Sequence, residues 1–282
     1  MTETLAAATY EAADQLPADA RAALRDLVLA LADSKRVLGL RYSDRMLGSP
    51  TLEAGIAASS MAQDEWGHAR LTYALLGDLG DDPKALEHER DAAEYRSIGT
   101  LDADLDGWNG MTAAGLLIDM ALTAQYAALV DSRYTPVRNR VQKLLDEEKF
   151  HFQYAAGWAR RIAQAPELRD GLAAALAKAL PEALRWLGRD DAPGIRRLVE
   201  EGIVRDLPSD RRSRFLARVG PVLEEIGMAG ALGVVRDAGE WTYAGELDWS
   251  GWDDATRRAG GSLDEQTAAR ARGDKNRALL MD

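Results

Sequence analysis

The chain has 282 residues, 46% of them hydrophobic, which is enough for one large domain with a substantial core. It contains no cysteine, which excludes disulfides, thiolate nucleophiles, cysteine-ligated zinc and cysteine-bound iron–sulfur clusters. The 46 acidic and 35 basic residues give a net charge of −11, which argues against a nucleic-acid partner because lysine and arginine supply most phosphate binding.

The sequence does not predict a membrane protein. No apolar run reaches the roughly 18 residues that a membrane-spanning helix needs. The first residues, Met1 to Leu5, lack the basic and apolar regions of a signal peptide. We therefore expect a soluble, cytoplasmic protein with no membrane partner.

Helical periodicity dominates the sequence and strand-like alternation is scarce, so we predict an all-α fold. Glycine- and proline-containing breaks at residues 48–50, 80–83 and 135–136 divide the first part of the chain. Between them lies a predicted short helix with a long crossover, over residues 84–110. Two helices, a crossover and two more helices form a connectivity that four-helix bundles allow. The four long helices are predicted over residues 18–47, 51–79, 111–134 and 137–165.

The rest of the chain is expected to add shorter helices to this bundle. Ser209 is a good N-cap for one of them, and residues 241–249 have strand-like character, as a hairpin or an extended arm. We expect one ferritin-like domain over residues 1–282, with the bundle at about 18–165 and a C-terminal helical extension at about 166–282. The helices of the extension are predicted over residues 167–188, 193–205, 209–227, 250–259 and 263–280.

Two Glu-x-x-His motifs include two of the three histidines of the chain. They are Glu65-Trp-Gly-His68 in the second predicted helix and Glu148-Lys-Phe-His151 in the fourth. A spacing of three residues places the carboxylate and the imidazole on one helical face. Two such faces on adjacent helices can enclose metal, as in ferritin-like di-iron proteins. Oxygen and nitrogen ligands without sulfur favour iron or manganese.

Each motif alone has a simpler interpretation, in which the glutamate and histidine of an amphipathic helix face solvent or pair locally. The presence of both motifs among Ala, Leu, Met and Phe residues favours the metal site. His88 lies in the charged run Glu87-His88-Glu89-Arg90 and is expected to be solvated.

Asp119 is the candidate carboxylate of the third helix. It is the only acid between Gly110 and Val130, and it interrupts an apolar run in which an unpaired charge would be costly. We therefore predict a metal ligand, with a buried salt bridge as the alternative. Asp131, near the end of this predicted helix, is expected at the surface.

The first helix departs from the pattern. Its candidate acids are Asp33 and Asp44, but the residue expected to point inward is Lys35. The residues expected on the same face as this lysine are Leu31, Leu38, Gly39 and Tyr42.

These segments resemble the ferritin-like subunits of the ring-1,2-phenylacetyl-CoA epoxidase family. The likeness spans roughly residues 20 to 275 and is greater to the catalytic subunit than to its non-catalytic partner subunit. The matching segments lie at residues 62–68, 117–119, 147–151, 224–228 and 245–249.

The resemblance implies a set of metal ligands. The sixth ligand position, a glutamate of the first helix, falls on Lys35, and residues 31–38 read more like the partner subunit, which lacks a working metal site. The positions that match ligands of the catalytic subunit are Glu65, His68, Asp119, Glu148 and His151.

The resemblance also implies an activity and its partners. It points to oxygen insertion into an acyl-CoA-linked or other aromatic substrate. It further implies association with copies of the chain or with a related ferritin-like subunit. An external reductase would be needed, because the sequence has no flavin or iron–sulfur motif.

Lys35 limits the charge that the site can hold. With Lys35 protonated, the carboxylates of Glu65, Asp119 and Glu148 leave a net charge of about −2, which one divalent metal brings to about 0 and two bring to about +2. We therefore predict that Lys35 takes the space of one metal and that the site binds one ion, near Asp119 and His151, or none. In the alternative, burial beside a cation lowers the pKa of the lysine, and a neutral Lys35 acts as a catalytic base or nucleophile.

Two functions remain open. In the first, the protein is a non-haem iron oxygenase subunit, with iron or manganese in a modified site. In the second, it is a structural subunit or pseudo-enzyme whose former metal site is a salt-bridged cluster of Lys35 and carboxylates. Iron storage fits less well, because storage cages are built from short subunits and this chain has a long C-terminal region.

Overall fold

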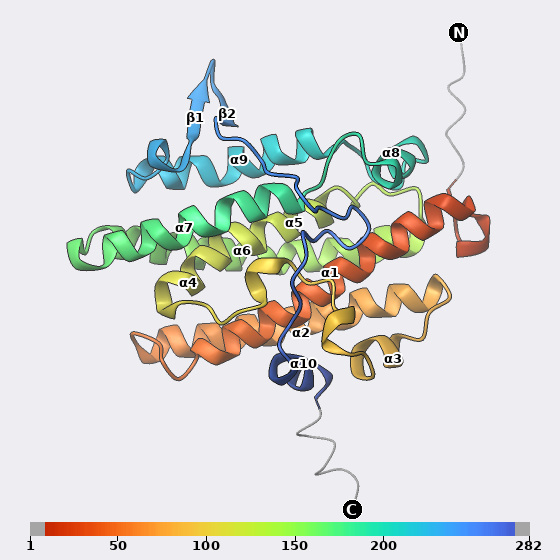
Figure 1. Cartoon of the computed structure of the whole chain (residues 1–282), viewed down its shortest axis with the longest axis horizontal. Coiled ribbons are helices and arrows are strands. Elements are labelled where there is room, and N and C mark those ends of the chain that lie inside the picture. Colours follow the sequence, from red (N-terminus) through yellow and green to blue (C-terminus); the bar gives the residue numbers. More distant parts are fainter. Residues whose placement is uncertain (1–8, 274–282) are drawn as a thin grey trace, which may run out of the picture.

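The computed structural model describes residues 9–273. Three long helices and one interrupted helix lie side by side and form the bundle (Figure 1). The long helices are α1 (Ala18–Arg45), α2 (Leu52–Asp78) and α6 (Thr135–Ala163). The chain is thus an all-α, ferritin-like bundle, as predicted, with a single small β-hairpin among the described residues.

Helices α1 and α2 form a tight antiparallel pair. The Thr51 side chain caps α2 by accepting a hydrogen bond from the backbone amide of Ala54, at 3.2 Å. Near the middle of the pair, Gly39 leaves room for the indole of Trp66, since a Cβ at Gly39 would lie 2.6 Å from that ring. This close approach places the inward face of α1 beside the first Glu-x-x-His motif, to which Trp66 belongs.

The predicted crossover is present between α2 and the third helix. It contains α3 (Pro83–His88) and two short 3₁₀ turns, Ala92–Glu94 and Gly99–Leu101. His88 is only partly exposed rather than fully solvated, because its Nδ1 lies 2.8 Å from the carbonyl oxygen of Arg272.

The third helix of the bundle is interrupted and ends earlier than predicted. It consists of α4 (Gly107–Ala113), a π-helical turn (Ala114–Ile118) and α5 (Asp119–Ala127). The helix does not continue to residue 134, because backbone groups beyond it pair with the C-terminal extension instead. The amide of Arg133 donates to the carbonyl of Gly202, and the carbonyl of Ala128 accepts from Arg205.

The C-terminal extension packs along the bundle (Figure 1). In α9, the buried guanidinium of Arg211 donates to Gln125 of α5 and to the carbonyl of Asp206. Near the end of the extension, Arg36 of α1 donates to the carbonyl of Ala271. The helices of the extension are α7 (Pro166–Trp186), α8 (Pro193–Glu200), α9 (Pro208–Glu225) and α10 (Glu265–Arg272), and its strands are β1 (Val234–Asp237) and β2 (Glu240–Tyr243).

The prediction of a helix over residues 250–259 was wrong. The Asp253 side chain accepts hydrogen bonds from the amides of Ala255 and Thr256, at 2.9 and 2.7 Å, and so holds a turn in place of a helix. Gly251 and Arg257 adopt positive φ angles of 68° and 56°, which a right-handed helix does not allow.

Three other features differ from the prediction, namely the N-cap of α9, the position of the hairpin and the end of α8, which lies at Glu200 instead of residue 205. Leu207 rather than Ser209 is the N-cap of α9, and the amide of Ser209 donates to Asp190 instead. The hairpin covers residues 234–243, so it overlaps only the start of the predicted strand-like stretch. Residues 274–280 of the last predicted helix lie outside the described residues.

Within the described part of the chain, the helices are too short or too polar to cross a lipid bilayer.

Candidate metal centre

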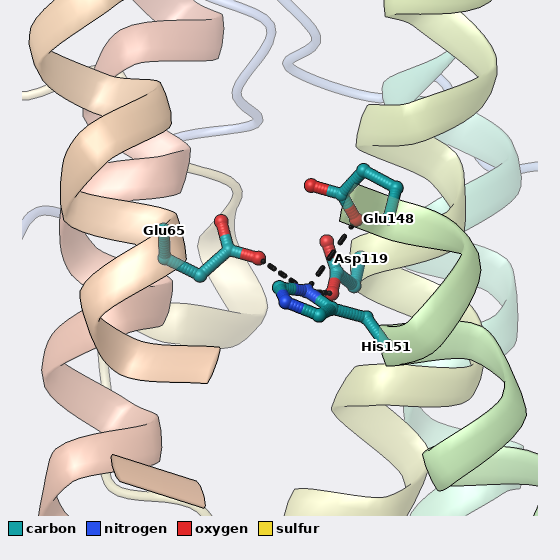
Figure 2. A group of neighbouring side chains, drawn as sticks. All are labelled: Glu65, Asp119, Glu148 and His151. Carbon is teal, nitrogen blue, oxygen red and sulfur yellow. Dashed lines mark hydrogen bonds and ion pairs between the residues drawn. The ribbon is translucent and has the colours of Figure 1, made fainter. Parts of the chain in front are cut away.

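Four predicted site residues converge in the middle of the bundle (Figure 2). Glu65 comes from α2, Asp119 from the start of α5, and Glu148 and His151 from α6. Each is at most 2% exposed, and each offers one ligand atom within 4.8 Å of those of the other three. His68 is equally buried, and its ring centroid lies 6.3 Å from that of His151. We call these five residues the cluster.

Lys35 lies against the same cluster, as the sequence predicted. Its side chain is fully buried, and its Nζ lies 2.6 Å from Asp119 Oδ1 and 2.5 Å from Glu148 Oε1. The two oxygens of Glu65 lie 2.9 and 3.1 Å away. One ammonium group therefore contacts all three carboxylates.

The two imidazoles are held in a reciprocal pattern between α2 and α6. His151 of α6 places Nε2 3.3 Å from Asp64 of α2, whereas His68 of α2 places Nε2 2.7 Å from Glu147 of α6. Their Nδ1 atoms face the buried carboxylates, with 3.0 Å from His68 to Glu148 Oε1. Each imidazole thus bridges a buried and a partly exposed carboxylate.

Asp64 and Glu147 are functional candidates that our sequence analysis missed. Their side chains are 44% and 38% exposed, so they connect the imidazoles to the surface. The available signal was an acidic residue directly before the glutamate of each motif, at Asp64-Glu65 and Glu147-Glu148. Such outer partners orient metal-binding histidines in proteins.

Asp119 owes its position to the π-helical turn that precedes it. A π turn inserts one residue into an α-helix and is frequent at functional sites. Within this turn, Gly115 allows close packing, since a Cβ there would lie 3.0 Å from Ala155 of α6 and 3.4 Å from the hydroxyl of Tyr42. That hydroxyl donates to Asp119 Oδ2 at 3.1 Å. Asp119 is therefore contacted on one oxygen by Lys35 and on the other by Tyr42.

Glu148 has a further donor in the third helix. The hydroxyl of Thr123, one turn after Asp119, lies 3.1 Å from Glu148 Oε2 and 2.9 Å from the carbonyl of Asp119. This hydroxyl links α5 to α6 at the cluster.

Charge interactions outweigh desolvation at Lys35 and Asp119. Burial alone would lower the pKa of Lys35, but the three carboxylates that it contacts, Asp119 first, raise the pKa well above its usual value. Burial alone would raise the pKa of Asp119, but Lys35 and His151 lower it well below its usual range. In this arrangement Lys35 is an ammonium, which opposes the interpretation of Lys35 as a neutral base or nucleophile.

The pKa values of Glu65, His68 and His151 shift in the opposite sense to that of Asp119. Burial, with the charge of Asp119, raises the pKa of Glu65 to about 7, although Lys35 opposes this shift. Burial alone would lower the pKa of His151, but its hydrogen bonds with Asp119, Asp64 and Glu65 raise it. Burial alone would lower the pKa of His68, but its hydrogen bond with Glu148 and the charges of Glu65 and Glu148 together raise it.

The acids of the first helix lie outside the cluster. Asp33 is buried in a separate ion pair with Arg90, and Asp44 pairs with Arg270 of α10. Asp131 is exposed, as expected. Among the described residues of α1, Lys35 and Tyr42 contact the cluster. Both donate hydrogen bonds to Asp119, and neither offers a carboxylate that could bind a metal ion.

The donor set of the cluster fits a metal ion. Buried carboxylate oxygens and imidazole nitrogens suit iron or manganese. The Nδ1 atoms of both histidines already point toward the buried carboxylates, which is the orientation that shared coordination requires. The ammonium of Lys35 uses the same oxygens, so it competes directly for part of this donor set.

Fold and cluster together define a ferritin-like helical bundle with a buried carboxylate–histidine centre. The chain belongs to the family of phenylacetic acid catabolic proteins, which it matches over residues 1–267. It is also similar to one of the subunits of the 1,2-phenylacetyl-CoA epoxidase of Escherichia coli (strain K12), at 26% identity over 137 residues. That match covers 48% of this chain and 55% of the relative, so the chain spans about half the length of the curated relative that it matches.

Proposed function

We propose that the protein is a subunit of a phenylacetyl-CoA-epoxidase-type oxygenase and that its cluster binds one divalent metal ion, iron in preference to manganese. The observation that carries this proposal is the convergence of Glu65, Asp119, Glu148 and His151, each of which offers one ligand atom within 4.8 Å of those of the other three. His68 adds an imidazole nitrogen to this donor set, because its Nδ1 lies 3.0 Å from Glu148 Oε1. Membership of a phenylacetic acid catabolic family supports the reaction class.

Electrostatics favour one ion over two. With Lys35 as an ammonium, three carboxylates and one divalent ion give a site charge of about 0, whereas a second ion would leave about +2 in a desolvated space. Lys35 contacts Asp119 Oδ1 at 2.6 Å, while His151 contacts the other oxygen, Oδ2, at 3.2 Å. We therefore assign the metal to the His151 side of Asp119 and the ammonium to the other side.

Bound iron would supply dioxygen activation for oxygen insertion into an aromatic acyl-CoA. The residues of the chain supply the surroundings. Lys35 neutralises part of the carboxylate charge, Tyr42 fixes the carboxylate of Asp119, and Asp64 and Glu147 fix the imidazoles. The near-complete burial of the cluster excludes bulk water.

The proposed activity requires partners. The described chain carries no cysteine and no flavin-binding signature, so electrons have to come from an external reductase. The relative is named as one subunit of an epoxidase. We therefore propose assembly with copies of this chain or with a related ferritin-like subunit.

A second candidate function has its own supporting observation. The ammonium of Lys35 already pairs with all three carboxylates, so the cluster is neutralised in part without any metal. In this alternative the chain is a structural subunit, and the cluster is a salt bridge that joins α1, α2, α5 and α6.

Metal analysis of the purified protein and of a Lys35→Glu variant separates the two functions. The proposal predicts about one iron per chain in the native protein and about two in the variant, since a carboxylate removes the positive charge and adds a ligand. The matched control is Lys178→Glu, at an exposed position of α7. It should leave the iron content unchanged. Native protein without iron after anaerobic loading with Fe²⁺ would contradict the oxygenase proposal and favour the structural subunit.

A further inference from the structure

Large apolar side chains are exposed at the end of the molecule where α1 turns into α2 and α6 into α7 (left in Figure 1). Leu47, in the turn between α1 and α2, is 92% exposed, and Leu52 and Ile56, one turn apart at the start of α2, are 77% and 62% exposed. Leu168, near the start of α7, is also exposed. Monomeric proteins rarely leave so many large apolar side chains exposed in one place. We call the surface formed by these four residues the apolar face.

The segment that carries most of the apolar face is nearly free of charge. Glu53 is the only charged residue among residues 47–63, whereas 29% of the whole chain is charged. Along the exposed side of α2, the two apolar residues of the face are followed by Ser60 and Gln63. Depletion of charge distinguishes the core of a protein–protein interface from the rest of a protein surface. The segment therefore has the composition of an interface.

Three adjoining hollows open on the apolar face, and Thr51 lines all of them. The first, of about 750 Å³, is lined by three residues of the face, Leu47, Leu52 and Ile56. The second, of about 640 Å³, lies between α2 and α6. The third, of about 580 Å³, includes Leu168 in its lining. The face thus offers both projecting side chains and recesses, which a surface needs if it is to contact a copy of itself.

Two side chains of opposite charge line the hollow between α2 and α6. Arg161 of α6 is exposed and lies over the ring of Trp158, 5.1 Å from its centroid. It has no carboxylate partner in the described part of the chain, and the exposed Glu53 of α2 has no basic partner there. In a twofold contact, residue i of one copy meets residue j of the other, and j meets i. Glu53 of one copy can therefore pair with Arg161 of the other, twice per dimer.

We propose that the apolar face is the interface between two copies of this chain, related by a twofold axis, with Glu53 and Arg161 paired across it. A copy fits this face because the face carries projections, recesses and one charge of each sign. Twofold dimers are also the commonest soluble oligomers. The interface names one of the two partners that the proposed function leaves open, and it does not rest on the metal.

The mass of the metal-free, full-length protein, measured by light scattering after size-exclusion chromatography, is the first test. We expect twice the mass of one chain at micromolar concentration. Ile56→Glu places a charge within the face at an exposed position and should give a monomer with an unchanged circular dichroism spectrum. Leu52→Glu serves the same purpose if Ile56→Glu fails to fold. The matched control is Val235→Glu, at an exposed apolar position of the β-hairpin, which should stay dimeric.

An exchange of charges tests the pairing and its symmetry. Arg161→Glu and Glu53→Arg should each weaken dimerisation several-fold, because each variant then places like charges opposite one another. An equal mixture of the two variants should form mixed dimers more tightly than either variant dimerises alone, because both pairs in the mixed dimer are attractive.

Four results would overturn the proposal: a monomeric native protein, a dimeric and folded Ile56→Glu variant, a mixture that dimerises no better than its components, or association only with a different ferritin-like subunit. No metal is used in these measurements. Their outcomes are therefore independent of iron content, which tests the proposed function separately.

Discussion

Lys35 is a hydrogen-bond donor at the centre of the bundle, at the position where the resemblance to the catalytic subunit implies a glutamate ligand. Its ammonium lies between carboxylates of three other helices, at 2.5 to 3.1 Å. A buried charge of this kind is costly unless every partner is in place. We therefore expect the contact that is proposed to limit metal binding also to stabilise the metal-free bundle.

Replacement of Lys35 by methionine should reveal this structural contribution. The variant keeps the volume of the side chain but leaves three buried carboxylates facing one another. We expect the free energy of unfolding of the metal-free protein to fall by about 3–5 kcal/mol, measured by urea denaturation. Addition of Mn²⁺ should recover part of the loss by binding to the folded state. A change below about 1 kcal/mol, the value typical of surface pairs, would show that the ion pairs do not form.

Tyr42 is predicted to affect metal affinity more than stability. Its hydroxyl donates to Asp119 Oδ2 at 3.1 Å, so Tyr42→Phe frees that oxygen without a change in packing. We expect metal affinity to fall by about tenfold, as for other outer partners of metal ligands, measured by competitive titration with Co²⁺. The matched control is Tyr134→Phe, whose buried hydroxyl has no hydrogen-bond partner in the described part of the chain. Equal affinities of the two variants would contradict a positioning role for Tyr42.

At the scale of elements, the crossover is tied to the bundle by a second buried ion pair. Asp33 of α1 accepts hydrogen bonds from Arg90, from the hydroxyl of Tyr73 at 2.5 Å and from the amide of Arg96 at 2.8 Å. The guanidinium of Arg90 also lies over the ring of Tyr95, 4.4 Å from its centroid. These contacts explain why Asp33 is buried and yet is not part of the cluster.

Asp33→Asn should loosen the crossover and leave the cluster intact. Removal of one charge leaves Arg90 buried and unpaired, so we expect a loss of about 3–5 kcal/mol in the free energy of unfolding. The control Asp131→Asn, at an exposed site, should cost at most about 1 kcal/mol. Iron content should match that of the native protein. An iron content that falls with stability would mean that Asp33 contributes to the metal site after all.

Much of the site follows from helical spacing. Residues three or seven apart share a helical face, so the two motifs and the inward face of α1 are predictable from the sequence. The π-helical turn before Asp119 is not, because its i+5 hydrogen bonds leave no clear residue pattern. The pairing of Asp33 with Arg90, 57 residues apart, depends on the path of the crossover, which periodicity does not determine.

At the scale of the molecule, the extension is joined to the bundle by buried polar contacts. Arg211 links α9 to α5, and Arg258 donates to the carbonyl of Ser97 in the crossover. Local sequence patterns did not predict these links, and they also missed the turn around Asp253 that leads into Arg258. We therefore propose that residues 18–165 and the extension form one domain.

A single domain should unfold in one transition. We expect tryptophan fluorescence and far-ultraviolet circular dichroism to give coincident urea curves, since Trp66 and Trp158 lie in the bundle and Trp186 and Trp241 in the extension. Two separate transitions, or a shift between the two signals, would mean that the extension folds independently.

We propose that one metal ion shares the cluster with the ammonium of Lys35. The most direct test is a crystal structure of the Fe²⁺-loaded protein with anomalous scattering at the iron edge. We expect one peak per chain, bonded to Asp119 and His151, with Lys35 still in contact with the opposite oxygen of Asp119. Two peaks, or a metal-free cluster with Lys35 in place under saturating iron, would contradict it.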